Sequence, residues 1–440
     1  MDILIQASQF FLSLSILIIL HEFGHFAAAK SFGMRVESFY LFFNPYFSLF
    51  KKKIGDTVYG IGWLPLGGYV KIAGMIDESM DKEQMAKPAE DWEFRSKPAW
   101  QRLIVMIGGV TVNVILAALI YWMVLFVYGE TYLPTKNVTY GIMVDSLGQE
   151  IGLRNGDKII TLDGKEVENF SKVPMEIILN DVKTIQVDRD GQIVDVQIPE
   201  GMMSELIKAP GLISVRIPFY VEKFAPGSVA EAAGFVKGDQ IVGLNDNSIM
   251  YFDAFKTALQ EFKGQEVNVN VLRDGEAKSI AVSVPEDGLL GVYPKGDLAE
   301  FFELEELKYG FFESLPKGIE KAGQTLVNYV KQLKLLFSPK NKGYESLGGF
   351  LTIGSIFTTT WDWNHFWNIT AFLSILLAVM NILPIPALDG GHVMFLLYEM
   401  ITGRQPHEKV MEVAQVVGMV LLFSLLLFAN GNDIYKHFFK

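Results

Sequence analysis

Four long apolar stretches alternate with polar sequence along this chain. They cover residues 3–29, 103–128, 366–384 and 410–429. A helix needs about 20 consecutive, mostly apolar residues to cross the hydrocarbon core of a bilayer. The pattern therefore predicts a polytopic α-helical membrane protein with four transmembrane helices, two in an N-terminal half (1–129) and two in a C-terminal half (346–440).

Between the second and third stretches, short apolar runs alternate with Asp-Gly and Pro-Gly turns. Residues 152–160 recur in similar form at 234–242, so this part of the chain contains an internal repeat. Short runs bounded by turn residues are typical of β-strands. The sequence therefore predicts two consecutive β-rich domains, at 130–210 and 211–296.

A shorter apolar segment, 58–70, lies between the first two spans and is rich in Gly and aromatic residues. It is too short and too broken to cross a membrane. We expect a β-hairpin within about 54–74 that re-enters the membrane, where an exposed strand edge could pair with an extended peptide. The alternative is an apolar surface loop.

From 298 to 337 apolar residues recur at helical spacing, and lysines mark the other faces. This pattern predicts an amphipathic helix within a linker at 297–345. Such a helix could lie on the membrane surface, clamp against the spans or pack on the β-rich domains. The pattern does not distinguish these three arrangements.

The second span begins with Gly108 and Gly109, followed by Asn113. Small residues allow two helices to approach closely. A lone Asn in a span is more often the partner in an interhelical hydrogen bond than a catalytic group. We therefore expect a packing role for all three residues.

The loop between the first two spans is rich in Lys and Arg, and includes Lys82 and Lys87. Loops with this bias stay in the cytoplasm. Both termini and the β-rich domains are then expected outside it. The N-terminus carries Asp2 and no basic region or cleavage site, so the first span is expected to be retained.

The overall composition narrows the possible partners. A net charge of −12 argues against a nucleic acid as partner. The chain has no cysteine, which excludes disulfides and thiolate metal sites. Any metal must be bound by His, Asp, Glu or water.

The first span ends in His21-Glu22-x-x-His25. On a helix this spacing puts both imidazoles on one face, where they can share a zinc ion. Glu22 lies beside them and could take a proton from a zinc-bound water. Ionisable residues in an apolar span are costly, so they indicate function.

The third span stops at Pro384, in a segment with two prolines and two glycines that contains Asp389. Broken helices at membrane depth mark sites, because the freed backbone groups face a cavity. Asp389 is the natural third zinc ligand, and a fourth position left to water is typical of catalytic zinc. His392 could also reach the metal, but the ligand count favours a structural role.

These features together resemble the site-2 protease family of intramembrane zinc metalloproteases, over essentially the whole chain. The resemblance rests on the pairing of the first motif with N-x-x-P-x-P-x-L-D-G-G at 381–391. The repeated Gly-x-x-x-Gly-Asp-x-Ile segments resemble the PDZ domains of bacterial envelope proteases. The chain departs from the family at 42–45 and 109–110, where Gly-Phe-Gly-Pro and Gly-Pro are common, and neither departure touches the zinc motif.

The resemblance implies that His21, His25 and Asp389 bind one Zn²⁺ ion. It also implies that Glu22 is the catalytic base. The substrate contacts expected from the family pattern are Asn381, Pro384, Gly67, Gly68, Tyr69 and Val70.

The function implied is hydrolysis of a peptide bond within the membrane segment of single-pass membrane proteins, in regulated intramembrane proteolysis and envelope stress signalling. Expected substrates are anti-sigma-factor-like proteins after a first extracytoplasmic cut, or signal-peptide remnants. The expected location is a bacterial inner membrane, with the active site toward the cytoplasmic side. The PDZ pair would either bind peptides or exclude bulky substrates.

Three rival functions are weaker. Glu22 argues against a non-catalytic membrane PDZ scaffold with a vestigial metal site, which has no need of a base. The lack of an inverted repeat argues against a secondary transporter. The apolar run before His21 argues against a zinc peptidase that acts on soluble peptides.

Overall fold

The computed structural model describes residues 2–75, 88–206, 211–336 and 348–439. Lys82, Lys87 and the last part of the expected amphipathic segment, from 337, lie outside the described residues. The chain forms two compact units, one of Met1–Gly129, Lys308–Lys334 and Tyr344–Lys440 and one of Glu130–Leu307 and Leu335–Gly343.

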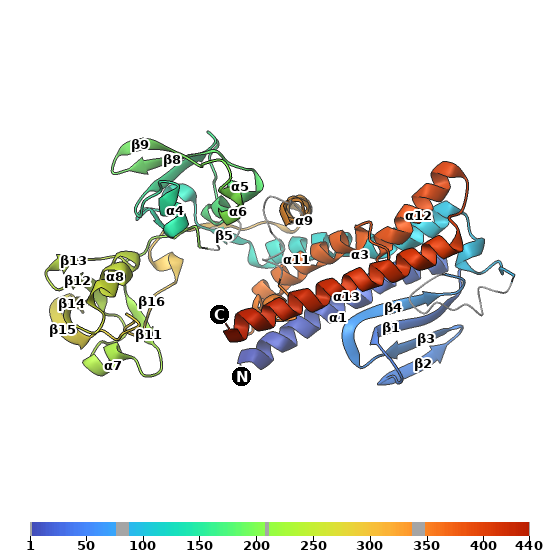
Figure 1. Ribbon diagram of the computed structural model, residues 1–440, viewed down its shortest axis with the longest axis horizontal. Helices are drawn as coiled ribbons and strands as arrows, with labels where there is room; N and C mark the ends of the chain where they lie inside the picture. The colour runs from blue at the N-terminus through green and yellow to red at the C-terminus, as the bar shows by residue number, and fades with distance from the viewer. Residues whose placement is uncertain (1, 76–87, 207–210, 337–347, 440) are drawn as a thin grey trace. The chain divides into compact units, whose positions relative to one another are not determined.

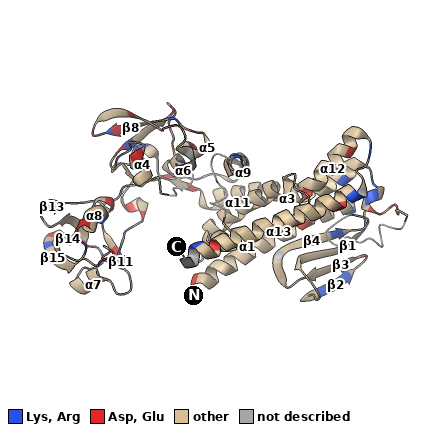
Figure 2. Ribbon diagram, in the orientation of Figure 1, with Lys and Arg blue, Asp and Glu red and all other residues tan. Residues whose placement is uncertain are grey.

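Within the described residues of the first unit, four helices are long and apolar enough to cross a membrane, as predicted. Charged residues are sparse along their length (Figure 2). The helices are α1 (Asp2–Ser31), α3 (Ala99–Tyr128), α11 (Trp363–Ile382) and α13 (Glu408–Phe439). The ends follow local chemistry: Asp362 caps α11 by accepting from the Asn364 N–H, and Gly129 ends α3 at a positive φ.

The close approach of α1 and α3 depends on glycine. A Cβ on Gly24 would lie 2.3 Å from the carbonyl oxygen of Gly108, and one on Gly108 would lie 2.7 Å from that of Gly24. Neither position has room for a larger residue. The expectation that small residues at the start of the second span permit close packing is confirmed.

Residues 36–72, all of them described, form a four-stranded sheet rather than the expected hairpin (Figure 1). Its order is β2 (Phe50–Ile54), β3 (Thr57–Ile61), β1 (Val36–Phe43), β4 (Leu64–Ile72). Strands β3 and β4 do not pair with each other; they lie on opposite sides of β1. The prediction was wrong because it considered neighbouring segments only, whereas Tyr69 of β4 stacks on Tyr40 of β1 with ring centroids 5.2 Å apart.

The third span is followed by a break and a further helix. After α11 ends at Ile382, a loop leads to α12 (Asp389–Thr402), which ends at Gly403 in the left-handed conformation. A short helix, α10 (Phe350–Ser355), precedes α11. The break lies where the prolines predicted it.

The second unit contains two β-rich domains, each with its own buried apolar core. The elements of the first are β6 (Ile142–Val144), α4 (Ser146–Glu150), β7 (Lys158–Leu162), α5 (Val173–Leu179), β8 (Thr184–Arg189), β9 (Gln192–Gln197), α6 (Met203–Leu206) and β10 (Ile213–Val215). Those of the second are β11 (Val221–Phe224), α7 (Val229–Ala233), β12 (Gln240–Leu244), β13 (Asn247–Ser248), α8 (Phe252–Leu259), β14 (Glu266–Arg273), β15 (Glu276–Ser283) and β16 (Val292–Pro294).

One ion pair recurs in both domains and explains part of the sequence repeat. Arg189 binds Asp157 through two nitrogens and donates to the carbonyl oxygen of Gly152. Arg273 makes the same contacts with Asp239 and Gly234. The Gly-x-x-x-Gly-Asp segment is therefore conserved between the copies as a turn held by a buried carboxylate.

The expected boundary between the domains, at 210/211, is wrong. Strand β10 pairs with β6 of the first domain, and Leu212 and Ile213 belong to the first core. The corresponding pair in the second domain is β11 with β16. The first domain therefore extends to about residue 215, since its closing strand follows the segment that was taken as its end.

The expected helix from 298 is also wrong in its first part. Leu298–Glu300 is a short 3-10 turn, and Phe302 packs into the core of the first β-rich domain. Strand β17 (Glu305–Leu307) then pairs with β5 (Glu130–Tyr132). The helix, α9, covers Phe311–Leu336, and its buried residues Ser314, Gly318 and Ala322 recur every four residues. The apolar spacing of residues 298–310 arises from contacts with the β-rich domain.

Candidate metal centre

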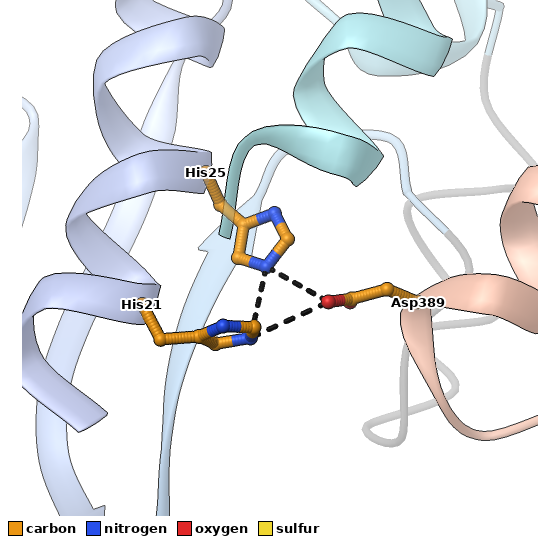
Figure 3. Close-up of side chains that lie close together, drawn as sticks. All are labelled: His21, His25 and Asp389. Carbon is orange, nitrogen blue, oxygen red and sulfur yellow. Dashed lines mark hydrogen bonds and ion pairs between the residues drawn. The ribbon is translucent and has the colours of Figure 1, made fainter. Parts of the chain in front are cut away.

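His21 and His25 lie on consecutive turns of α1 and point to the same side (Figure 3). Their Nε2 atoms are 3.3 Å apart, and both side chains are buried. The spacing of four residues produces this geometry directly, because residues i and i+4 share a helix face. Helix α3 packs against both imidazoles, since a Cβ on its Gly109 would lie 2.4 Å from His25 Nε2 and 2.6 Å from His21 Cε1.

Asp389 reaches the same point from the other end of the chain. It is the first residue of α12, and its Oδ2 lies 3.3 Å from His21 Nε2 and 3.3 Å from His25 Nε2 (Figure 3). The break after α11 makes this possible, since it turns the start of α12 toward α1. Sequence reasoning predicted this convergence, and the structure brings the three side chains together.

The three ligand atoms fit a zinc ion. In a tetrahedral site with bonds of about 2.0–2.1 Å, two ligand atoms lie about 3.3–3.4 Å apart. The observed separations are 3.3 Å. Asp389 Oδ2 is buried and has no hydrogen-bond donor among the described residues. An orphaned oxygen beside two imidazole nitrogens is a donor set that suits Zn²⁺.

Two further groups orient the imidazoles. His25 Nδ1 donates to the carbonyl oxygen of Val105, which leaves Nε2 as the ligand atom. The side-chain nitrogen of Asn113 lies 3.2 Å from His21 Nδ1, and its buried Oδ1 has no donor among the described residues. If the amide turned over so that its oxygen and nitrogen exchanged places, Oδ1 would accept from the Nδ1–H of His21, and the lone pair of His21 Nε2 would face the metal position. Asn113 forms the expected interhelical contact, but its place beside a ligand was missed.

A cavity of about 350 Å³ opens onto these residues. Glu22 lies in its wall, next to the ligand face of α1. Strand β4 forms another part of the wall, through Gly68, Tyr69 and Val70. The cavity therefore brings a carboxylate and a strand to the three ligand atoms.

The other expected substrate contacts, Asn381, Pro384 and Gly67, are not among the residues that line the cavity. The Asn381 side-chain nitrogen is 3.2 Å from His21 Nε2, although Asn381 does not line the cavity wall. Pro384 is exposed in the break, and Gly67 packs its backbone against the ring of Phe43. His392 lines the cavity but is not one of the three clustered ligands.

Comparison with known proteins gives one consistent result. The sequence model of peptidase family M50 matches residues 9–425. The chain is 31% identical to the "Regulator of sigma E protease" of Haemophilus influenzae, over 99% of this chain and 100% of that protein. It is 30% identical to a "Putative zinc metalloprotease" of Vibrio cholerae, over 99% of both. It is 28% identical to the "Regulator of sigma-E protease RseP" of Escherichia coli, over 98% of both.

Proposed function

The chain belongs to peptidase family M50, the site-2 proteases, and is a zinc metalloprotease; from this premise we propose that it hydrolyses peptide bonds inside the membrane. The observation that carries the proposal is the meeting of His21, His25 and Asp389 at the end of an apolar helix. Soluble substrates have little access to such a position, whereas a segment that lies in the membrane can reach it.

His21, His25 and Asp389 are proposed to hold the zinc ion. When bound, zinc supplies a Lewis acid that lowers the pKa of water and polarises a carbonyl group. Glu22, in the cavity wall, accepts the proton of the attacking water and later delivers it to the nitrogen of the leaving amine. His25 and His21 keep their ligand atoms oriented through Val105 and Asn113.

Strand β4 is proposed to bind the substrate backbone. Among the described strands it is the last in its sheet and pairs with β1, and its residues Gly68, Tyr69 and Val70 line the cavity. A membrane helix must unwind before hydrolysis, because its carbonyl groups are engaged in i→i−4 hydrogen bonds. Addition of the unwound segment to β4, at Gly68, Tyr69 and Val70, would replace those bonds and hold the peptide beside His21, His25 and Asp389.

Asn381 is proposed to donate a hydrogen bond to the substrate carbonyl, because its side-chain nitrogen lies beside His21 Nε2. Pro384 and Gly67 are proposed to act through the backbone. The prolines around 384 prevent α11 from continuing, and Gly67 takes a φ of 148°, which a residue with a Cβ rarely adopts.

The substrates are proposed to be single-pass membrane proteins, either anti-sigma factors already cut outside or signal-peptide remnants. The names of the Haemophilus and Escherichia relatives support a link to sigma-E regulation. The two β-rich domains are proposed to be PDZ domains that bind peptides or hinder bulky ectodomains. We propose a bacterial inner membrane, with the termini and these domains outside.

The test uses purified full-length protein in detergent with a model single-pass substrate. Wild type is expected to cleave within the membrane segment of the substrate. Glu22→Gln is expected to retain zinc, because Glu22 is not a ligand, and to lose cleavage. Asp389→Asn is expected to lose zinc as well.

Zinc content separates the possible failures. If wild type and Glu22→Gln both bind zinc and neither cleaves any of several membrane substrates, a non-catalytic scaffold becomes the better proposal. If wild type binds no zinc, the ligand assignment is wrong.

A further inference from the structure

The tip of the four-stranded sheet exposes large apolar side chains. These exposed side chains, which we call the tip patch, are Tyr46, Phe47, Leu49, Phe50 and Trp63. The patch is ordered: the rings of Phe47 and Trp63 stack with centroids 5.8 Å apart, and Trp63 Nε1 donates to the carbonyl oxygen of Pro45. Isolated exposed apolar residues are common, but a contiguous patch of this kind marks an interaction surface.

A run of positive charge adjoins the tip patch. Lys51, Lys52 and Lys53 lie within β2 and are all exposed. Figure 2 shows the blue of basic residues on this strand. Asp56 is the one acidic residue in the segment 50–61, so the local sequence carries an excess of positive charge. An aromatic patch beside a lysine cluster suits the interface of an anionic membrane, where rings sit at headgroup level and lysines meet phosphates.

The direction of the strands shows how the tip patch and the three lysines are ordered along α1. At Gly68, β4 lies against Ile18 and Glu22 of α1, whereas Ile72 packs in the cluster of Ala29 near the end of that helix. The sheet therefore lies beside the second half of α1, with its tip facing back along the helix. Strand β2 starts at the tip, because Phe50 pairs with Ile61 and Ile54 with Thr57. The tip patch is thus deeper along α1, and the lysines follow toward its end.

We propose that the tip patch and Lys51, Lys52 and Lys53 bind anionic phospholipid headgroups of the leaflet at the C-terminal end of α1. The aromatic side chains enter the boundary between headgroups and acyl chains, and the ammonium groups pair with phosphate groups. This inference depends on the membrane placement of the apolar helices and not on proteolysis.

The contact has a consequence for the metal centre. Tyr69 of β4 donates a hydrogen bond to Asn44 Oδ1 over 2.9 Å and stacks on Phe43, so the tip loop is joined to the cavity wall. Lipid contact at the tip therefore fixes the depth of β4 beside His21 and His25.

The experiment exploits the absence of cysteine from the chain. A spin label is attached to the variant Tyr46→Cys. A separate variant, Asp246→Cys, carries a control label on an exposed turn of the other unit, where it should stay in water. Full-length protein is reconstituted in nanodiscs of phosphatidylcholine, with or without phosphatidylglycerol. Accessibility to oxygen and to a water-soluble nickel complex is measured by power saturation.

In phosphatidylglycerol the Tyr46 label is expected to show high oxygen and low nickel accessibility. The variant K51Q/K52Q/K53Q should return it to the value in phosphatidylcholine alone, since each lysine changes partition to an anionic surface by about fivefold. The charge-conserving variant K51R/K52R/K53R should keep the label immersed. The matched control K158Q/K165Q/K172Q removes three exposed lysines from the other unit and should change nothing.

Three results would overturn the proposal. High nickel accessibility at Tyr46 in both lipids would place the tip patch in water. Immersion that is equal in both lipids and unaffected by K51Q/K52Q/K53Q would show apolar insertion without headgroup recognition. Low accessibility to both reagents, with dipolar broadening between labels, would show that a second copy of the chain covers the patch.

Discussion

Gln415 accepts a hydrogen bond from the backbone N–H of Ala387 over 3.2 Å, two residues before Asp389. Gln415 is buried on α13, and Ala387 has a φ of 81°, a strained value for a residue with a side chain. On the same helix, a Cβ on Gly418 would lie 1.6 Å from the carbonyl oxygen of Pro386. Helix α13 therefore holds the loop that ends in a proposed zinc ligand.

Gln415→Leu is expected to weaken zinc binding by about 10- to 100-fold, the usual cost of losing a group that orients a ligand. The change keeps the volume but removes the acceptor for the Ala387 N–H. Competition with a chelator measures the affinity. Gln415→Glu keeps an acceptor and should stay near wild type, as should Val417→Leu on the exposed face of α13. Equal zinc affinity in Gln415→Leu and wild type would contradict the role of this contact.

Gly109→Ala is expected to abolish zinc binding and activity. A Cβ at this position would lie 2.4 Å from His25 Nε2 and 2.6 Å from His21 Cε1, closer than real atoms approach. The imidazoles must then move or α3 must shift. Zinc content of the purified protein checks the result. Gly323→Ala is the control, because it lies in a helix with nothing within 4 Å and should stabilise the protein by about 0.5–1 kcal/mol.

Arg102 on α3 forms a buried ion pair with Glu399 on α12, the helix that begins with Asp389. Arg102→Met or Glu399→Leu alone is expected to cost about 3 kcal/mol, because each leaves an uncompensated buried charge. The double variant should recover most of that loss, since an apolar pair of similar size can replace a buried ion pair. Thermal unfolding in detergent measures the stability of wild type, the two single variants and the double variant. Additive losses would show that the two side chains are not coupled.

The second β-rich domain is expected to lose stability in acid through Asp239. Burial opposes ionisation of Asp239, but hydrogen bonds from Arg273 and from the Val236 N–H outweigh it and hold the pKa of the carboxyl below its ordinary value. The unfolded chain then takes up a proton at higher pH than the folded domain. The stabilisation is therefore complete above the ordinary pKa of about 4 and is lost as pH falls through the folded pKa.

Asp239→Asn should cost about 2–3 kcal/mol at neutral pH, and the difference from wild type should shrink in acid. Pulse proteolysis in urea measures the stability of the second β-rich domain within the full chain. Mass spectrometry identifies cleavage in the segment 219–290. A constant difference between pH 7 and pH 3 would show that ionisation of Asp239 does not contribute.

Several features of this protein follow from the sequence alone because they depend on local pattern. Apolar length determined the four long helices, and the spacing of His21 and His25 determined their shared face. Prolines around 384 determined the break before Asp389. The repeated Gly-Asp turns determined two similar β-rich domains, since each copy folds on its own core.

Other features were decided only by tertiary structure, because they join segments with no local signal in common. Strand β4 pairs with β1 rather than with β3, its neighbour in sequence, through stacking of Tyr69 on Tyr40. Leu212 closes the first β-rich domain after its apparent end. Asn113 and Gln415 lie beside the candidate metal centre because α3 and α13 pack there. Apolar periodicity specifies which face of a helix is buried, whereas packing and loop closure decide which polar side chain meets which partner.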